Sequence, residues 1–243
     1  MLIGEPDRTQ ADLNFKAFGI PIRVHPFFWV AGLMLGMQIK DPVLILVWIV
    51  ALFVSILVHE LGHAFAARYF GYEPWITLYA FGGLASYQPY QQTPRSRILI
   101  LLAGPGAGFA LAGLISLGIL ASGHRMSFEF ARVPFDFERY ESPVLNFLLF
   151  QLLYINIFWG LINLFPVYPL DGGQIAREIM VESNPQEGIR QSLILSIATA
   201  IALAIAGMVW TGDIFMGVLF GYLAYMSYAT LQAYYGRGGS GRW

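Results

Sequence analysis

Two histidines and one glutamate fall within five residues, His59-Glu60-Leu61-Gly62-His63, of an otherwise apolar segment. On a helix, side chains four residues apart project from one face, so His59 and His63 could share one zinc ion while Glu60 acts as a base on water. The pattern also occurs by chance, and a buried histidine can be a hydrogen-bonded packing residue. However, an ionised side chain at the centre of a membrane helix costs roughly 2.5 to 3.5 kcal/mol. Three ionisable groups so close together therefore favour a metal site.

The third ligand must come from elsewhere, because a catalytic zinc ion normally takes three protein ligands and leaves one position for water. Asp171 is the best candidate: Pro166 and Pro169 must end the preceding helix and free backbone groups that need a polar environment. The same aspartate could instead cap the helix that follows it, and the two roles are compatible. Asn156 and Asn163 are seven residues apart on the preceding helix, so we expect them to share a face that looks toward this site.

The other two histidines, His25 and His124, stand at the ends of apolar runs, which is typical of interfacial histidines, and we do not expect them to bind the metal. The chain has no cysteine, so a metal site must use histidine and carboxylate, and a cysteine nucleophile is excluded. A net charge of −1 gives no case for nucleic acid.

The elements that must hold these residues are membrane helices. Of 243 residues, 57% are hydrophobic and only 12% are charged, about half the charge of a soluble domain. Most of the apolar runs approach or exceed the roughly 20 residues that cross a bilayer. The sequence therefore predicts an all-α polytopic membrane protein, a single domain over residues 1–235 with a flexible tail at 236–243. The expected helices are about 25–39, 43–70, 97–121, 144–166, 191–210 and 213–235.

Charge placement predicts the orientation. With the N-terminus inside, ten of the fourteen lysines and arginines fall on the cytoplasmic face, as the positive-inside rule requires. We therefore expect both termini in the cytoplasm. The polar N-terminal segment has no apolar core typical of a signal peptide.

A short β-hairpin is predicted beside the metal helix. The stretches WITLY at 75–79 and LASY at 84–87 favour strands, and Gly82 and Gly83 favour a tight turn between them. An exposed edge of either strand could pair with an unwound substrate peptide. The alternative is a plain cytoplasmic hairpin. The stretch 122–143 is interpreted as a solvated loop.

These motifs resemble those of the site-2 protease family of intramembrane zinc metalloproteases. That family pairs H-E-x-x-H with N-x-x-P-x-x-x-L-D-G on a later helix, and the second motif matches Asn163 to Gly172 here. The segments Gly19 to Trp29 and Leu102 to Gly108 resemble other parts of short prokaryotic members. We expect no PDZ or CBS domain.

The resemblance implies one zinc ion bound by His59, His63 and Asp171, with Glu60 as general base and acid. It also implies substrate contacts at Asn163 and at a re-entrant hairpin around Gly82 and Gly83. The expected activity is regulated intramembrane proteolysis of transmembrane protein substrates in the lipid bilayer, in the bacterial inner membrane and without a nucleotide. The alternatives are a catalytically silent metal-binding regulator, against which the intact Glu60 argues, and a transporter, which would need polar residues across both leaflets.

Overall fold

The structure of the chain is a computed structural model that describes residues 5–80, 82–88, 92–127, 135–212 and 214–236. The chain forms two compact units. The sheet unit consists of Gly4–Tyr90 and Ala103–Gly160, and the C-terminal unit consists of Gln91–Leu102 and Leu161–Trp243. Residues 237–243 of the predicted tail lie outside the described residues.

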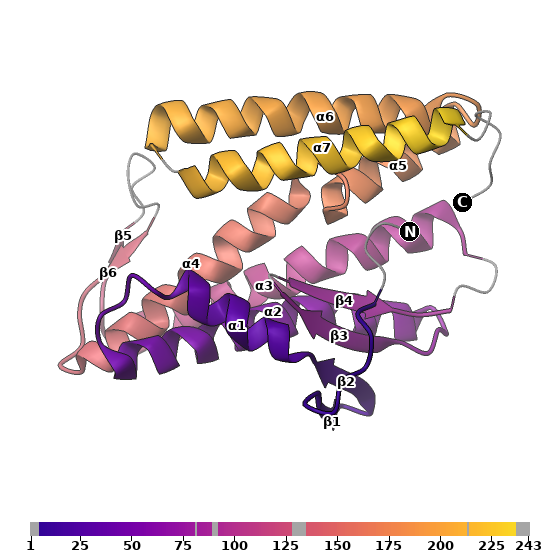
Figure 1. Ribbon diagram of the computed structural model, residues 1–243. Helices are drawn as coiled ribbons and strands as arrows, with labels where there is room; N and C mark the ends of the chain where they lie inside the picture. The colour runs from indigo at the N-terminus through magenta and orange to yellow at the C-terminus, as the bar shows by residue number, and fades with distance from the viewer. Residues whose placement is uncertain (1–4, 81, 89–91, 128–134, 213, 237–243) are drawn as a thin grey trace. The chain divides into compact units, whose positions relative to one another are not determined.

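Helices dominate both units (Figure 1). Five of the described helices are long and apolar enough to cross a membrane: α2 (Pro42–Tyr69), α3 (Pro94–Ala121), α4 (Pro143–Leu164), α6 (Gly188–Ala206, apolar to Val209) and α7 (Ile214–Gly236). The first predicted span is a shorter helix, α1 (Pro26–Leu35), whose ten residues extend about 15 Å. Helix α5 (Asp171–Ser183) is the helix expected after Asp171, and a π-helical turn, η1 (Gly207–Thr211), follows α6. The predicted class, a helical membrane protein, is confirmed.

Local sequence explains where the first helices begin. Asp41 caps α2, because its Oδ1 accepts the amide hydrogen of Val43 at 2.8 Å, and Pro42 occupies the first helical position, where its missing N–H is not needed. His25 caps α1 in the same way, because its Nδ1 accepts the amide hydrogen of Phe27 at 3.1 Å. Helix α3 continues through Pro105.

A four-stranded sheet accompanies α2 in the sheet unit. Its strands are β1 (Leu13–Ala17), β2 (Ile20–Val24), β3 (Trp75–Tyr79) and β4 (Gly82–Ser86), in that order across the sheet. Strands β2 and β3 are parallel, and the other two pairs are antiparallel. The predicted hairpin is β3–β4, but its turn is earlier than expected: Tyr79 pairs with Gly82, so the connection is residues 80–81, and Gly82 and Gly83 belong to β4. Residue 81 lies outside the described residues.

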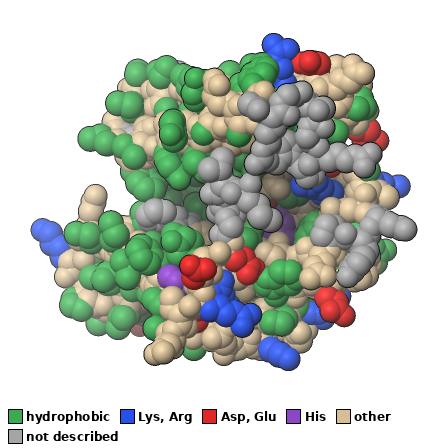
Figure 2. All heavy atoms as spheres, turned by 45° about the vertical axis from the view of Figure 1, so that its right-hand side comes forward, with side chains coloured by type: hydrophobic (Ala, Val, Ile, Leu, Met, Phe, Trp, Pro, Cys, Tyr) green, Lys and Arg blue, Asp and Glu red, His purple; other side chains and the backbone are tan. Residues whose placement is uncertain are grey.

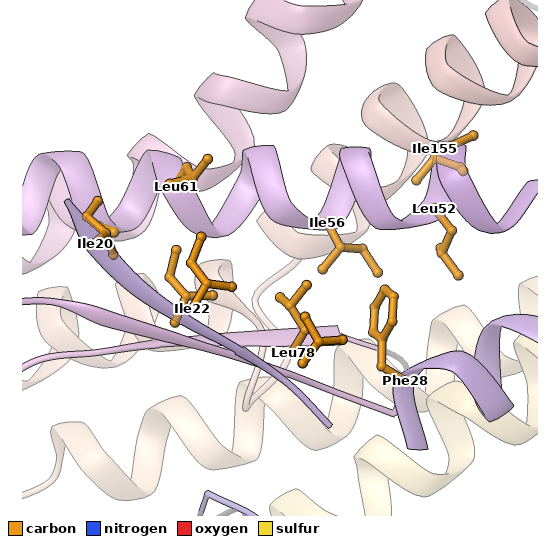
Figure 3. Close-up of a cluster of buried hydrophobic side chains, with 12 residues drawn as sticks. Ile20, Ile22, Phe28, Leu52, Ile56, Leu61, Leu78 and Ile155 are labelled. Atoms are coloured by element: carbon orange, nitrogen blue, oxygen red, sulfur yellow. The ribbon is translucent and has the colours of Figure 1, made fainter. Parts of the chain in front are cut away.

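The sheet packs on α2 through one of its faces. Residues Ile20, Ile22 and Val24 alternate along β2 and are almost completely buried, because side chains two apart share a face of a strand. Figure 3 shows this apolar cluster, in which sheet residues, Phe28 of α1 and Ile155 of α4 meet α2 side chains such as Leu52, Ile56 and Leu61. This packing fixes β4 beside the turn of α2 that carries His59 and His63.

The described residues 122–127 and 135–143 pair and pack more closely than the predicted solvated loop would. Strands β5 (Met126–Ser127) and β6 (Asp136–Phe137) pair antiparallel, and the side chains of Phe135 and Phe137 are buried against α3 and α4 residues. The aromatic residues explain the difference, because burying each one removes a large apolar surface from water. Residues 128–134 of the predicted loop lie outside the described residues.

In the C-terminal unit, α6 packs along α7. Both helices expose large apolar side chains, including Ile201 and Val218. Figure 2 shows that hydrophobic side chains cover much of the face it presents. A surface of this kind is unusual in a soluble protein and is expected of helices that contact lipid.

Candidate metal centre

The two histidines of the motif meet on one face of α2. Their Nε2 atoms are 3.1 Å apart, and their rings are nearly perpendicular. Both side chains are buried. Two imidazole ligands of a tetrahedral zinc ion, with Zn–N bonds of about 2.0 to 2.1 Å, hold their nitrogens about 3.3 Å apart. The observed separation therefore fits a pair of zinc ligands, as the four-residue spacing predicts.

Glycines of α2 and α3 allow the two helices to meet at this point. A Cβ on Gly104 would lie 2.2 Å from His63 Nε2, and one on Gly62 would lie 2.3 Å from the carbonyl oxygen of Ala103. Such distances are far below van der Waals contact, so any side chain would push the helices apart. The close approach of Gly104 to the ring of His63 is evident only in the structure.

Glu60 lies against the hairpin. Its side chain is buried, and a Cβ on Gly83 of β4 would be 2.3 Å from Glu60 Cγ and 2.6 Å from Oε1. Gly83 lies on the face of the sheet that packs on α2, so the carboxylate occupies the space that a side chain of β4 would fill. Gly82 has no such contact, since its nearest neighbour would be Trp159 at 3.9 Å. The structure thus brings Gly83, and not Gly82, to the predicted base.

Asn156 of α4 supports α2 one turn before His59. Its Nδ2 donates to Ser55 Oγ and to the Leu152 carbonyl oxygen, both at 2.8 Å, and the asparagine is buried. Sequence reasoning identified Asn156 but missed Ser55, whose position four residues before His59 is the signal that could have found it. A buried amide between two apolar helices fixes their contact more specifically than apolar packing does.

Asp171 and Asn163 belong to the C-terminal unit, and both are buried. Asp171 is the first residue of α5, and the cap position is Leu170, which makes no side-chain capping bond. Asp171 is therefore not the N-cap of α5, the alternative role that the sequence allows. An acidic group in the first turn is still favourable, because it faces the positive end of the helix dipole.

His25 and His124 have structural surroundings of their own. His25 caps α1 and contacts the Tyr79 ring edge-on, with centroids 4.9 Å apart. His124 stacks on Tyr140 at 3.8 Å, and its Nδ1 is 3.1 Å from Ser122 Oγ. Neither is part of the histidine pair on α2.

Comparison with known proteins is consistent with this geometry. The profile of peptidase family M50 matches residues 47–205, which include both motifs. A putative zinc metalloprotease of Synechocystis is 32% identical over 71% of this chain and 45% of its own length. A zinc metalloprotease of Methanocaldococcus jannaschii is 32% identical over 68% of this chain and 44% of its own. The chain thus spans less than half the length of these relatives.

A solved structure has the same fold. The site-2 protease from Methanocaldococcus jannaschii matches with a TM-score of 0.59 and 22% identity, covering 90% of this chain and 95% of that one. Zinc is the metal named for the relatives, and the paired imidazoles of α2 fit it. From the match over residues 47–205 and the motifs within it, the chain belongs to peptidase family M50, as its resemblance to the site-2 proteases predicts.

Proposed function

We propose that this protein is an intramembrane zinc metalloprotease that hydrolyses peptide bonds within or near transmembrane segments of other proteins. The observation that carries the proposal is Glu60, a carboxylate buried between a pair of histidines suited to zinc and the strand β4. A scaffold that only bound metal would need no base there. Family membership and the names of the relatives support the same reaction.

We assign the metal to His59, His63 and Asp171. All three are buried, and their types suit one metal ion. The two histidines come from the sheet unit and the aspartate from the C-terminal unit. The proposal accordingly treats residues 1–235 as one metalloprotease domain.

The reaction needs one acid–base residue from the chain. Zinc, when bound, supplies a Lewis acid that polarises the scissile carbonyl and lowers the pKa of water toward about 7. Glu60 accepts the proton of the attacking water and donates it to the amine that leaves when the C–N bond breaks. Asn163 is assigned to the substrate backbone. No covalent enzyme intermediate is required.

Strand β4 is assigned to the substrate. A transmembrane helix must unwind before its carbonyls become accessible, and strand addition would replace the hydrogen bonds it loses. The strand order makes β4 an edge strand, while β3 is paired on both sides, so the alternative of pairing along Trp75–Tyr79 is wrong. Because Gly83 of β4 touches Glu60, a peptide on this edge would run beside the base. Gly82 and Gly83 would then contact the peptide through their backbone.

The proposed setting is the bacterial inner membrane with both termini in the cytoplasm, and the role is regulated intramembrane proteolysis. The five apolar helices support a membrane setting. The distribution of lysine and arginine favours cytoplasmic termini, and an even number of crossings then requires the short helix α1 to insert as a sixth segment. The substrates would be membrane proteins with single spans.

Replacing the base tests the proposal. Purified wild-type protein, Glu60→Gln and the half-exposed control Glu187→Gln would be compared on a panel of single-span substrates, with zinc content measured in each. We expect Glu60→Gln to lose cleavage by at least about 100-fold while keeping zinc, and the control to behave as wild type. Cleavage by Glu60→Gln at the wild-type rate would refute the proposed role. Transport of zinc or protons in vesicles by a protein that cleaves none of the panel would favour the transporter instead.

A further inference from the structure

Two buried serines join α6 and α7 in the C-terminal unit. Ser196 and Ser227 have no exposed surface, and their Oγ atoms are 2.8 Å apart. Hydroxyl groups between apolar helices commonly hold membrane helices together. Here the hydrogen bonds also extend to a third segment, the connection between α4 and α5.

The bonds form an ordered chain. The amide of Tyr168 donates to Ser196 Oγ at 2.6 Å, and Ser227 Oγ donates to the carbonyl oxygens of Leu223 at 2.9 Å and Tyr168 at 3.1 Å. Each hydroxyl has one hydrogen. When Ser227 shares its hydrogen between the two carbonyl oxygens, Ser196 donates to Ser227. The serine pair, Ser196 with Ser227, therefore satisfies both backbone polar groups of Tyr168.

These backbone groups need partners because the connection is not helical. Residues 165–170 contain two prolines, and an unsatisfied polar group away from water costs free energy comparable to a lost hydrogen bond. The same connection is also packed on the two helices: Val167 is fully buried in a cluster with Ala200 of α6 and Phe220 of α7. Helices α6 and α7 thus hold the connection by both polar and apolar contacts.

The connection held by the serine pair packs tightly against the start of α5, where Asp171 lies. A Cβ on Gly173 would lie 2.4 Å from the Tyr168 nitrogen, and one on Gly172 would lie 2.1 Å from the Leu164 carbonyl oxygen. Gln174 Nε2 also donates to the Pro169 carbonyl oxygen at 3.0 Å. The start of α5 is therefore pressed onto the connection, and a shift of Tyr168 must move Asp171.

We propose that Ser196 and Ser227 are positioning residues that fix the carboxylate of Asp171 for zinc. The inference rests on the proposed function for one step, the role of Asp171 as a ligand. It assigns α6 and α7 a part in supporting the metal centre. Groups that orient a ligand in this way typically contribute about 10- to 100-fold to metal affinity.

Hydrogen exchange tests the contact itself. Ser196→Ala should speed exchange of the Tyr168 amide by at least about 10-fold, because it removes the acceptor. The matched control is Ser192→Ala: Ser192 lies on the same helix and is buried, but its Oγ donates to the Ile189 carbonyl oxygen of its own helix at 2.8 Å. Equal exchange in the two variants would overturn the proposed contact.

Zinc affinity tests the positioning. Competition with a chromophoric chelator should give about 10-fold weaker zinc binding for Ser196→Ala and for Ser227→Ala, and unchanged binding for Ser192→Ala. The double variant should be little worse than either single one, because the two hydroxyls act in one chain. Wild-type affinity in Ser196→Ala, measured on protein with an unchanged melting temperature and faster Tyr168 exchange, would overturn the positioning role. Wild-type affinity in Asp171→Asn would instead overturn the ligand assignment of the proposed function.

Discussion

Gly104 offers a sharp test of how the metal centre is built. A Cβ at this position of α3 would lie 2.2 Å from His63 Nε2, 2.3 Å from Cε1 and 2.8 Å from Cδ2. Non-bonded heavy atoms prefer separations of about 3.5 Å or more. In Gly104→Ala the ring, or the whole of α3, must therefore retreat by about 1 Å.

The size of this displacement sets the expected effect. Zinc sites tolerate errors of about 0.2 Å in ligand distance, so a shift of about 1 Å in Nε2 should remove most of the contribution of His63. We expect zinc affinity to fall by about 100-fold or more and proteolysis to fall with it. Overpacking lowers the free energy of unfolding by about 1 to 3 kcal/mol. The higher helix propensity of alanine offsets up to about 1 kcal/mol of this loss. The variant should still fold.

Gly106 is the matched control. It is two residues further along the same helix, it is exposed, and a Cβ there would meet no atom within 4 Å. Gly106→Ala should raise the melting temperature slightly, because it gains about 0.5 to 1 kcal/mol of helix propensity, and should leave zinc binding and cleavage unchanged. Zinc competition, thermal unfolding and substrate cleavage would be measured side by side on both variants. Zinc binding at wild-type affinity by Gly104→Ala would refute the argument that this glycine makes room for a ligand.

Further predictions concern the base, the helix contact, the N-terminal turn and the metal. Gly83→Ala should push Glu60 by about 1 Å and lower kcat by about 100-fold while zinc is retained; loss of zinc instead would show that the strand supports the ligands. Asn156→Leu should destabilise the protein by about 1 to 3 kcal/mol in thermal unfolding, and an unchanged melting temperature would contradict a structural amide. A hydrogen bond from the Thr9 hydroxyl is the main cause that lowers the pKa of Asp12. The stability that ionised Asp12 contributes is therefore fully present above about pH 4. It is lost as pH falls through the lowered pKa, and the melting-temperature advantage of wild type over Asp12→Asn should shrink below pH 4; a constant advantage would argue against it. Removing the metal with a chelator should abolish cleavage and added zinc should restore it, whereas cleavage that survives zinc removal would exclude a metalloprotease.

The histidine pair and its base could be read from sequence because the information is local. A helix places residues four apart on one face whatever surrounds it, and the structure bears this out for His59 and His63. Long apolar runs likewise predict helices without further context, since backbone polar groups must be satisfied internally in lipid. The shortest of these runs was the exception, because α1 ends at Leu35 and does not reach the length of a span.

Contacts between distant segments were decided by the tertiary structure. Nothing local marks Gly83 as the neighbour of Glu60, or Gly104 as the neighbour of His63, because glycine in these segments is also compatible with a turn or with plain helix packing. Strands β1 and β2 were missed because five-residue strands next to polar residues give a weak pattern. The pairing of β2 with β3 also joins segments some fifty residues apart. The same holds for Ser196 and Ser227, whose partner Tyr168 is remote in sequence.

The sequence by itself determined the residue types of the candidate site and the class of the protein: a histidine pair with a glutamate on an apolar helix, a second acidic motif and a helical membrane protein. Only the tertiary structure decided which small residues make room for that chemistry and which helices support it. The physical reason is that ligand type and spacing follow from the geometry of a single helix. Steric room and hydrogen-bond partners arise only where separate elements pack against one another.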